Sequence, residues 1–438
     1  MSIRLPHPLI LLLGGVAIAA MLTWVLPAGQ YERRTDPASG RAVVVPGTYT
    51  LTSPAPVRPA GAAMAVPRGF VAGAEVILVV LLVGGAFALL DATGALGRLV
   101  ASLVAHARNP QVIVVVVSLT FATFGALENM HEEIIALVPT LVVLSSRLGF
   151  GAVTAVAMSL GAATVGSAFG PTNPFQTGIA LRFAELPALS QGALRFALLG
   201  ASVAVWIVYT LAMTRRDDVK PEVSVIISPA TRRDFLLLAI AVIPFAPYVF
   251  GVLKFDWGFN ELSALFLIAG LVIGVVSGLS LSGSAAALLK GMETMLAASL
   301  YIGVARAISV VLTDGRVIDT ILHGFAVPLS QASGSTAALL MIPFQALLHV
   351  AVPSVSGQAV LTMPVMAPLS DLLGISRDAA VIAYQTGAGL VDMMIPTSGA
   401  LLAILAGAQI SFGRWMRFAA PGAGLVAIVG IVGTLLAA

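Results

Sequence analysis

The chain has 438 residues and a formal net charge of +3, with 58% hydrophobic and only 10% charged residues. Soluble domains carry about 25% charged residues, so this composition predicts a membrane protein. The sequence contains no cysteine, which excludes disulfides and metal–thiolate centres. It also lacks a basic patch interleaved with aromatic residues, so nucleic acid is not an expected partner.

Apolar windows long enough to cross about 30 Å of hydrocarbon recur along the chain. The first, at 9–26, ends in a Trp-Val-Leu-Pro sequence instead of a small-residue cleavage site, so we interpret it as a retained span. The Pro/Gly-rich segment 27–69 predicts an extramembrane loop with little helix. Further spans are expected at 70–90, 193–214, 235–253, 261–281, 295–313 and 416–437.

A short basic linker divides the chain. Residues 215–233 begin with Arg215 and Arg216, end with Arg232 and Arg233, and include Lys220. Because basic residues gather in cytoplasmic loops, this linker is expected on the cytoplasmic side. We therefore expect a first unit at 1–214 and a second at 234–438.

Two interrupted apolar regions, 110–185 and 336–410, are similar to each other. One ungapped shift of the sequence on itself aligns Pro139 with Pro364 and Pro171 with Pro396, and identical residues recur between these two pairs. Prolines are rarely matched by chance at both ends of such a window, so we infer an internal repeat.

Each copy predicts a helical hairpin, at 110–147 or 336–373, followed by a broken helix, at 150–185 or 376–408. With the linker in the cytoplasm, a count of crossings places the second copy upside down relative to the first. Inverted repeats with broken helices are the architecture of many secondary transporters. The sequence therefore predicts an all-α polytopic membrane protein with two inverted-topology repeats and re-entrant helical hairpins.

Prolines inside the apolar runs predict where the helices break. Irregular backbone at membrane depth is tolerated only where protein or a water-filled cavity satisfies it. The exposed carbonyl ends suit a cation and the amide ends suit a carboxylate; ordinary proline kinks in packed helices are the simpler alternative. The predicted breaks lie at Pro171, Pro174 and Pro396. The candidate substrate-binding residues at the breaks and hairpin tips are Asn129, Thr172, Asn173, Ser354, Ser356, Gly357, Gln358, Thr397 and Ser398.

The tip of the first hairpin, 128–133, holds several carboxylates and one imidazole in a short stretch. One charge at the bilayer centre costs roughly 2.5–3.5 kcal/mol on insertion scales, so such a cluster faces a cavity or pairs internally. It could bind sodium, carry a proton or hold a cationic group of the substrate; a shallow, solvated tip is the alternative. The candidate ion-coupling residues are Glu128, His131, Glu132, Glu133 and Asp392. No ligands are assigned to sodium, and no cofactor is expected beyond a coupling Na⁺ or H⁺.

Arg306 is the only basic residue deep in an unbroken predicted span. Pairing with Asp392 or Asp314 and attraction of an anion are both open at this point.

Several long stretches carry a more specific signal. They are SGQAVLTMPVMAPLSDLLGISRDAAVIAYQ, IPTSGALLAIL, ISFGRWMRF, DGRVIDTIL and the opening HPLILLLGGVAIAAMLTWVLPAGQYER. Across nearly the whole chain the sequence resembles the YfcC-type branch of the C4-dicarboxylate anaerobic carrier family, within the ion-transporter superfamily. It departs from that pattern at Met130-His131 and near Asp392.

The resemblance implies a secondary transporter of small organic solutes such as dicarboxylates or basic amino acids. It also implies a homodimer with an elevator-type fold, in which the hairpins and broken helices move against a fixed scaffold. It extends the site assignment to Glu132, Glu133, Pro171, Thr172, Asn173, Ser356, Gln358, Pro396, Thr397 and Ser398.

The favoured function is ion-coupled or exchanging transport of a small carboxylate-bearing solute, an amino acid or a C4-dicarboxylate, across a bacterial inner membrane. The expected partners are this solute and membrane lipid. A cation/proton antiporter without an organic substrate is the alternative. An enzyme is not expected, because the sequence contains no GxSxG or HExxH motif and no paired catalytic aspartates.

Overall fold

The chain folds into helices joined by short loops, with two small pairs of β-strands near the N-terminus. The computed structural model describes residues 8–35, 42–45, 47–95, 97–99, 102, 109–187, 189–214, 230–255, 257–329 and 331–438. The first-half elements are α1 (Pro8–Val25), β1 (Gly29–Gln30), β2 (Arg33–Thr35), β3 (Ala42–Val44), β4 (Thr50–Leu51), α2 (Pro59–Ala72), α3 (Ala74–Ala92), α5 (Pro110–Glu128), α6 (Ile134–Arg147), α7 (Ala152–Val156), the π-helical η1 (Ala157–Gly161), α8 (Ala162–Phe169), the π-helical η2 (Pro174–Gly178), α9 (Ile179–Phe183) and α10 (Gly192–Met213). The second-half elements are α11 (Arg232–Val242), α12 (Phe245–Phe255), α13 (Phe259–Val276), α14 (Leu281–Glu293), α15 (Leu296–Asp314), α16 (Ile318–Leu329), α17 (Gly334–Ala351), α18 (Val355–Leu372), α19 (Arg377–Tyr384), the π-helical η3 (Gln385–Gly389), α20 (Gly399–Gly407) and α21 (Phe412–Ala437).

Seven helical stretches in the described part of the chain are long and apolar enough to cross a membrane. They lie in α3, α5, the continuous run from α7 to α8, α10, α13, α17 and α21. The prediction of an all-α, multi-pass membrane protein is therefore confirmed.

The helix bounds differ from the expected spans in two places. The region expected as one span at 235–253 consists of α11 and α12, separated at residues 243–244. The loop expected at 27–69 contains the start of α2, whose first residue is Pro59. Proline fits this first position because its missing N–H would have no helical partner there. Most of the predicted basic linker, 215–229, lies outside the described residues.

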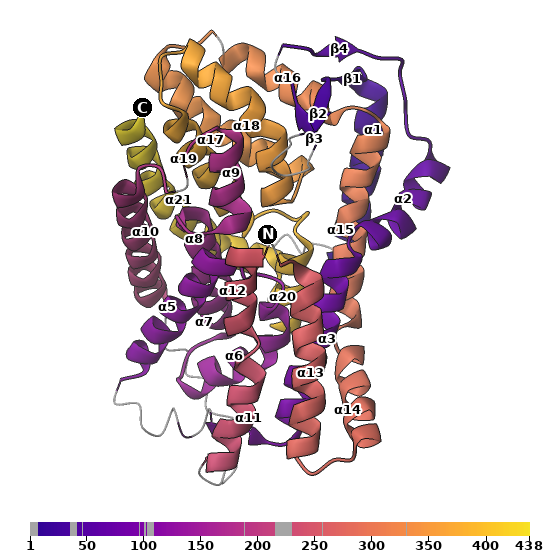
Figure 1. Ribbon diagram of the computed structural model, residues 1–438, viewed down its shortest axis with the longest axis vertical. Helices are drawn as coiled ribbons and strands as arrows, with labels where there is room; N and C mark the ends of the chain where they lie inside the picture. The colour runs from indigo at the N-terminus through magenta and orange to yellow at the C-terminus, as the bar shows by residue number, and fades with distance from the viewer. Residues whose placement is uncertain are drawn as a thin grey trace.

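The helices form two groups in Figure 1, with α1, α2, α3, α13, α14 and α15 on one side. The other side holds α5, α8, α10, α19 and α21. In the first group α2 packs on α15 and α14 packs on α3; in the second, α10 packs on α21 and on α8. The groups meet where α20 contacts α15 and where α6 contacts α3.

The helices α6 and α18 end with the same cap, at positions that the shift of the sequence on itself aligns. The amide of Leu148 donates to Leu144 and Ser145, and that of Leu373 donates to Leu369 and Ser370. In each case a glycine with positive φ follows, Gly149 at 83° and Gly374 at 67°. A left-handed residue closes a helix there, and only glycine adopts that conformation without strain.

Both long helices that follow are interrupted, again at aligned positions. The side chain of Asn173 accepts hydrogen bonds from the amides of Phe175 (3.0 Å) and Gln176 (2.8 Å) and so caps η2. The hydroxyl of Ser398 accepts from the amide of Leu401 at 3.3 Å and caps α20. These polar residues begin a new helix half, because each satisfies N–H groups that have no helical partner.

A buried polar network joins the two interrupted helices. Arg195 of α10 is 1% exposed and donates to Asp378 (2.8 Å) and to Gln385 (2.5 Å). The amide of Gln385 in turn donates to the carbonyl of Ala168 and to the hydroxyl of Thr177, both at 2.8 Å. The π-helical segments η2 and η3 are therefore tied to each other and to α10.

Candidate solute and ion site

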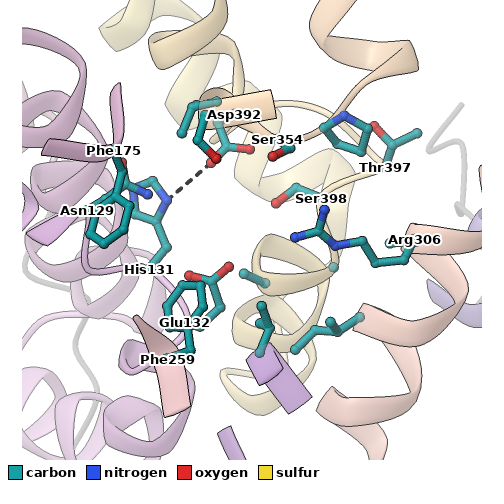
Figure 2. Close-up of a pocket in the computed structure, with 18 residues that line it drawn as sticks. Asn129, His131, Glu132, Phe175, Phe259, Arg306, Ser354, Asp392, Thr397 and Ser398 are labelled. Carbon is teal, nitrogen blue, oxygen red and sulfur yellow. Dashed lines mark ion pairs between the residues drawn. The ribbon is translucent and has the colours of Figure 1, made fainter. Parts of the chain in front are cut away.

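A cavity of about 120 Å³ lies where two connections between helices meet the second helix break. Residues from tip 1 (128–133, between α5 and α6) and tip 2 (353–358, at the start of α18) line it, together with residues from the break before α20. The helices α13 and α15 of the other group close it with Phe259, Ile302 and Arg306. The cavity therefore lies between the two groups of helices, as Figure 2 shows in close-up.

Tip 1 turns because its first residue leaves the helix. Asn129 caps α5 in the left-handed conformation, with φ of 61°, which asparagine tolerates better than most residues. Asn129, His131 and Glu132 then line the cavity. Glu133 points elsewhere: it is 3% exposed, and its Oε2 has no hydrogen-bond partner.

Tip 2 presents neutral polar groups. Ser354 caps α18 by accepting a hydrogen bond from the amide of Gly357 at 3.3 Å. Ser354 and Ser356 line the cavity, whereas Gly357 lines a separate cavity of about 340 Å³ with Arg33 and Arg316.

The second break contributes a carboxylate and two hydroxyls. Asp392, Thr397 and Ser398 all line the cavity. The hydroxyl of Thr397 and the side-chain carbonyl of Asn129 are buried without hydrogen-bond partners. Buried polar atoms are normally paired, so these two oxygens are available to accept from a cationic group or to ligate a small cation.

Asp392 is held between two histidines. Its Oδ2 lies 3.2 Å from Nδ1 of His131, and its Oδ1 lies 3.2 Å from Nε2 of His349. The other nitrogen of His349 lies 2.7 Å from Oε1 of Gln358. Figure 2 shows the contact of Asp392 with His131 at the edge of the cavity.

Arg306 forms no ion pair within the described part of the chain. Of the two carboxylates considered as its partners, Asp314 pairs with Arg68, and Asp392 is occupied by the histidines. Figure 2 shows the guanidinium of Arg306 pointing into the cavity, opposite the carboxylate of Glu132. The cavity thus carries a guanidinium group on α15 and a carboxyl group on tip 1.

Some of the residues predicted for the site do not line this cavity. The first break faces α5: Thr172 donates to the carbonyl of Ala126 (3.3 Å), and Asn173 donates to that of Gly125 (2.9 Å). Gln358 is buried in the network with His349. Pro171 is buried, Pro174 is the first residue of η2, and Pro396 is exposed at the second break. The side chain of Glu128 lies outside the described residues.

Several residues near the site were not assigned to it from the sequence. Phe175 and Phe259 line the cavity. Arg306, for which pairing or attraction of an anion was left open, also lines it, and His349 reaches it through Asp392. Arg306 and His349 carry a signal in the sequence, because a charged or titratable residue in an apolar helix needs a partner. The phenylalanines carry none, since apolar residues fill every span.

The comparisons with known proteins agree over the length of the chain. The family model of DcuC, the C4-dicarboxylate anaerobic carriers, matches residues 5–438. The putative basic amino acid antiporter YfcC of Escherichia coli K12 is 27% identical over 481 residues, covering 98% of this chain and 95% of that protein. An uncharacterized protein of Haemophilus influenzae is 27% identical over 492 residues, covering 98% of this chain and 96% of that protein.

Two solved transporter structures are similar along nearly their whole length. MtrF of Neisseria gonorrhoeae aligns with a TM-score of 0.48 and 16% identity, covering 99% of this chain and 95% of MtrF. The YdaH transporter of Alcanivorax borkumensis aligns with a TM-score of 0.46 and 18% identity, covering 98% of each chain.

Proposed function

The chain belongs to the C4-dicarboxylate anaerobic carrier family of secondary transporters, and from this premise we propose that it carries an amino acid, bound in the cavity between Arg306 and Glu132. This family consists of transporters and not of enzymes. Transport is coupled to an ion or to exchange with a second solute and follows an alternating-access cycle.

The unpaired charges of opposite sign carry this proposal. The guanidinium of Arg306 matches a carboxylate, which it binds with two parallel hydrogen bonds. Glu132 and the oxygen acceptors of Asn129 and Thr397 match an ammonium group. A zwitterion satisfies both ends of the cavity, whereas a C4-dicarboxylate would place its second carboxylate near Glu132. The E. coli relative is described as a putative basic amino acid antiporter, which is consistent with this choice.

The hydroxyls of Ser354, Ser356 and Ser398 add neutral donors beside Arg306. Together with the amide groups at the start of α18 and α20, they are suited to a carboxylate. Thr172, Asn173, Gly357 and Gln358 act in this proposal by positioning the breaks and tip 2.

We further propose that the two halves, 1–214 and 234–438, are inverted repeats on either side of the linker 215–233. The shared caps of α6 and α18, and the shared cap position of Asn173 and Ser398, support this. The hairpins α5–α6 and α17–α18 enter and leave the membrane on the same side, and their tips meet at the cavity. The group with the hairpins then moves against the group with α15, as in an elevator, within a homodimer of the bacterial inner membrane.

Uptake into proteoliposomes tests the proposal. Labelled arginine, ornithine and succinate are each supplied with and without sodium and proton gradients. We expect the wild type to take up an amino acid. We expect Arg306→Gln and Glu132→Gln each to lower this uptake at least about tenfold, because a hydrogen-bonded charge contributes roughly 1.5–3 kcal/mol. Arg417→Gln, which removes an exposed arginine of α21, is the matched control and keeps wild-type uptake.

Two other outcomes would contradict the proposal. Uptake of succinate without uptake of either amino acid would show that the substrate is a dicarboxylate. Sodium–proton exchange without uptake of any organic solute would favour the cation/proton antiporter.

A further inference from the structure

We propose that His131, Asp392 and His349 together form the proton-carrying site of the transporter. This inference rests on the function proposed above and specifies its coupling ion as H⁺. The three side chains form one connected cluster that joins tip 1, the second break and α17, with tip 2 reached through Gln358.

The four ring nitrogens of the two histidines all face oxygen atoms. Two face the carboxylate of Asp392 at 3.2 Å. The other nitrogen of His349 faces Oε1 of Gln358 at 2.7 Å, and that of His131 faces the hydroxyl oxygen of Ser167 at 3.4 Å. Two neutral imidazoles carry two hydrogens between them. Since four oxygen atoms face the ring nitrogens and only two ring hydrogens are present, the cluster can bind one or two additional protons.

The orientation of Gln358 is fixed by the backbone. Its Nε2 donates to the main-chain carbonyl of Gln345 at 2.8 Å and to the side-chain Oε1 of that residue at 2.7 Å. A carbonyl can only accept, so the amide of Gln358 cannot be reversed without two oxygens facing each other. Its Oε1 must then accept from Nδ1 of His349.

The hydrogen bond between Ser167 and His131 also has a fixed direction. The hydroxyl of Ser167 donates to the carbonyl of Thr164 at 3.0 Å. Its oxygen is therefore an acceptor for Nε2 of His131. Each histidine already uses one hydrogen on an outer acceptor, and a hydrogen between each ring and Asp392 requires an added proton.

The cluster is placed so that its charge matters for binding. His131 and Asp392 line the cavity, and Asp392 is 18% exposed, whereas His349 is fully buried. With both rings neutral the cluster has a net charge of −1, and with both rings protonated its net charge is +1. The first state attracts an ammonium or guanidinium group of a solute, and the second repels it, so a proton and a cationic solute group compete for one site.

Few other charges face this cluster in the described part of the chain. They are Glu132 and Glu133 on tip 1 and Arg306 on α15, with the phenol of Tyr384 on α19. The remaining partners, Ser167, Gln345 and Gln358, are uncharged.

The test separates coupling from binding. The purified protein is placed in proteoliposomes that contain a trapped pH indicator, in sodium-free choline buffer. Counterflow of labelled arginine or succinate measures binding and exchange, and the indicator measures the proton movement that a solute gradient drives. The variant is His349→Gln, which keeps a hydrogen-bonding side chain but cannot take up a proton. His323→Gln, in α16 against Tyr31 and Tyr49, is the matched control.

The expected result is that His349→Gln lowers the solute-driven proton signal, per molecule of solute exchanged by counterflow, at least about tenfold. His323→Gln behaves as the wild type in both assays. Thermal unfolding checks that the variant is folded; if it is not, His131→Gln is compared with its own counterflow in the same way.

A full proton signal in folded His349→Gln would overturn the inference. So would wild-type counterflow that produces no proton signal, or counterflow that appears only when sodium replaces choline. Failure of wild-type counterflow for both solutes in either buffer would instead overturn the function proposed above.

Discussion

At the scale of single residues, Asp234 forms a close ion pair with Arg98 at the start of α11. It is 1% exposed and accepts from Arg98 at 2.6 and 3.0 Å and from Thr231 at 2.8 Å. The hydrogen bond from Arg98 holds the pKa of its carboxyl well below the usual value. We expect Asp234→Asn to lower the free energy of unfolding by about 3 kcal/mol, because it leaves Arg98 without its counter-charge.

The pH dependence of this pair has a definite sign. A carboxyl whose folded pKa is depressed contributes its full stabilisation above its unfolded pKa, near 4, and loses it as the pH falls through the folded value. Thermal unfolding in detergent between pH 7 and pH 3 should therefore show a loss below about pH 4 that is smaller in Asp234→Asn. Asp371→Asn removes an exposed pair with Arg377 and should change stability by less than about 1 kcal/mol; equal effects of the two variants would contradict the prediction.

The sequence indicated part of the site at this scale. Asn129, Glu132, Ser354, Ser356, Thr397 and Ser398 were predicted from local signs, namely a break or a polar tip in an apolar run, and all line the cavity. Arg306 and His349 stand out as charged or titratable residues in apolar helices, but which groups they meet depends on helix packing across the molecule, and no local pattern encodes that packing. Thr172 and Asn173 have the right chemistry, but helix capping and the carbonyls of α5 use it.

At the scale of elements, α5 and α8 approach so closely that only glycine fits between them. A Cβ on Gly166 would lie 2.0 Å from the carbonyl oxygen of Ala122. We expect Gly166→Ala to lower the free energy of unfolding by about 2 kcal/mol, because backbone atoms cannot move aside as a side chain could. Gly200→Ala in α10, where a Cβ meets nothing within 4 Å, is the control; a similar loss there would show that helical alanine, not the contact, is responsible.

The cap at the first break allows a second prediction. Asn173→Ala removes the acceptor for two amides and the donor to Gly125, so we expect about 2 kcal/mol of lost stability and slower transport. Asn173→Asp keeps the acceptor and should recover part of both. Chemical denaturation and uptake measure the two effects, and an Asp variant no better than Ala would exclude a capping role.

Helix bounds were the most predictable feature of the elements. Prolines, glycines and caps act within a few residues, so the helix ends and breaks between α5 and α9 and between α17 and α20 could be predicted closely from sequence. The split between α11 and α12 was not predicted, although Pro244 lies at the split and is a local signal of the same kind.

At the scale of the whole molecule, the buried Arg195–Asp378 pair joins α10 to the second broken helix. We expect either Arg195→Met or Asp378→Leu alone to lower the free energy of unfolding by about 3–5 kcal/mol, since each leaves a buried charge unpaired. The double variant should lose clearly less than the sum of both single losses. Additive losses in thermal unfolding would show that the two side chains act independently.

The arrangement of the two groups depends on long-range packing, and the sequence alone did not assign α10 and α21 to the group with the broken helices. Because Gln385 also bonds Thr177 and Ala168, the two breaks are expected to move together rather than separately.

Tip 1 and tip 2 would occupy equivalent positions in the proposed repeats, but they differ in the charge of their side chains. In the alignment of the repeats, His131 and Glu132 of tip 1 correspond to Ser356 and Gly357 of tip 2. Under the proposed inversion, a solute arriving from one side of the bilayer meets carboxylates first, and one arriving from the other side meets hydroxyls and backbone amides. Transport is then asymmetric: carrier molecules inserted into vesicles in opposite orientations should saturate at different solute concentrations, although both contain the same central cavity.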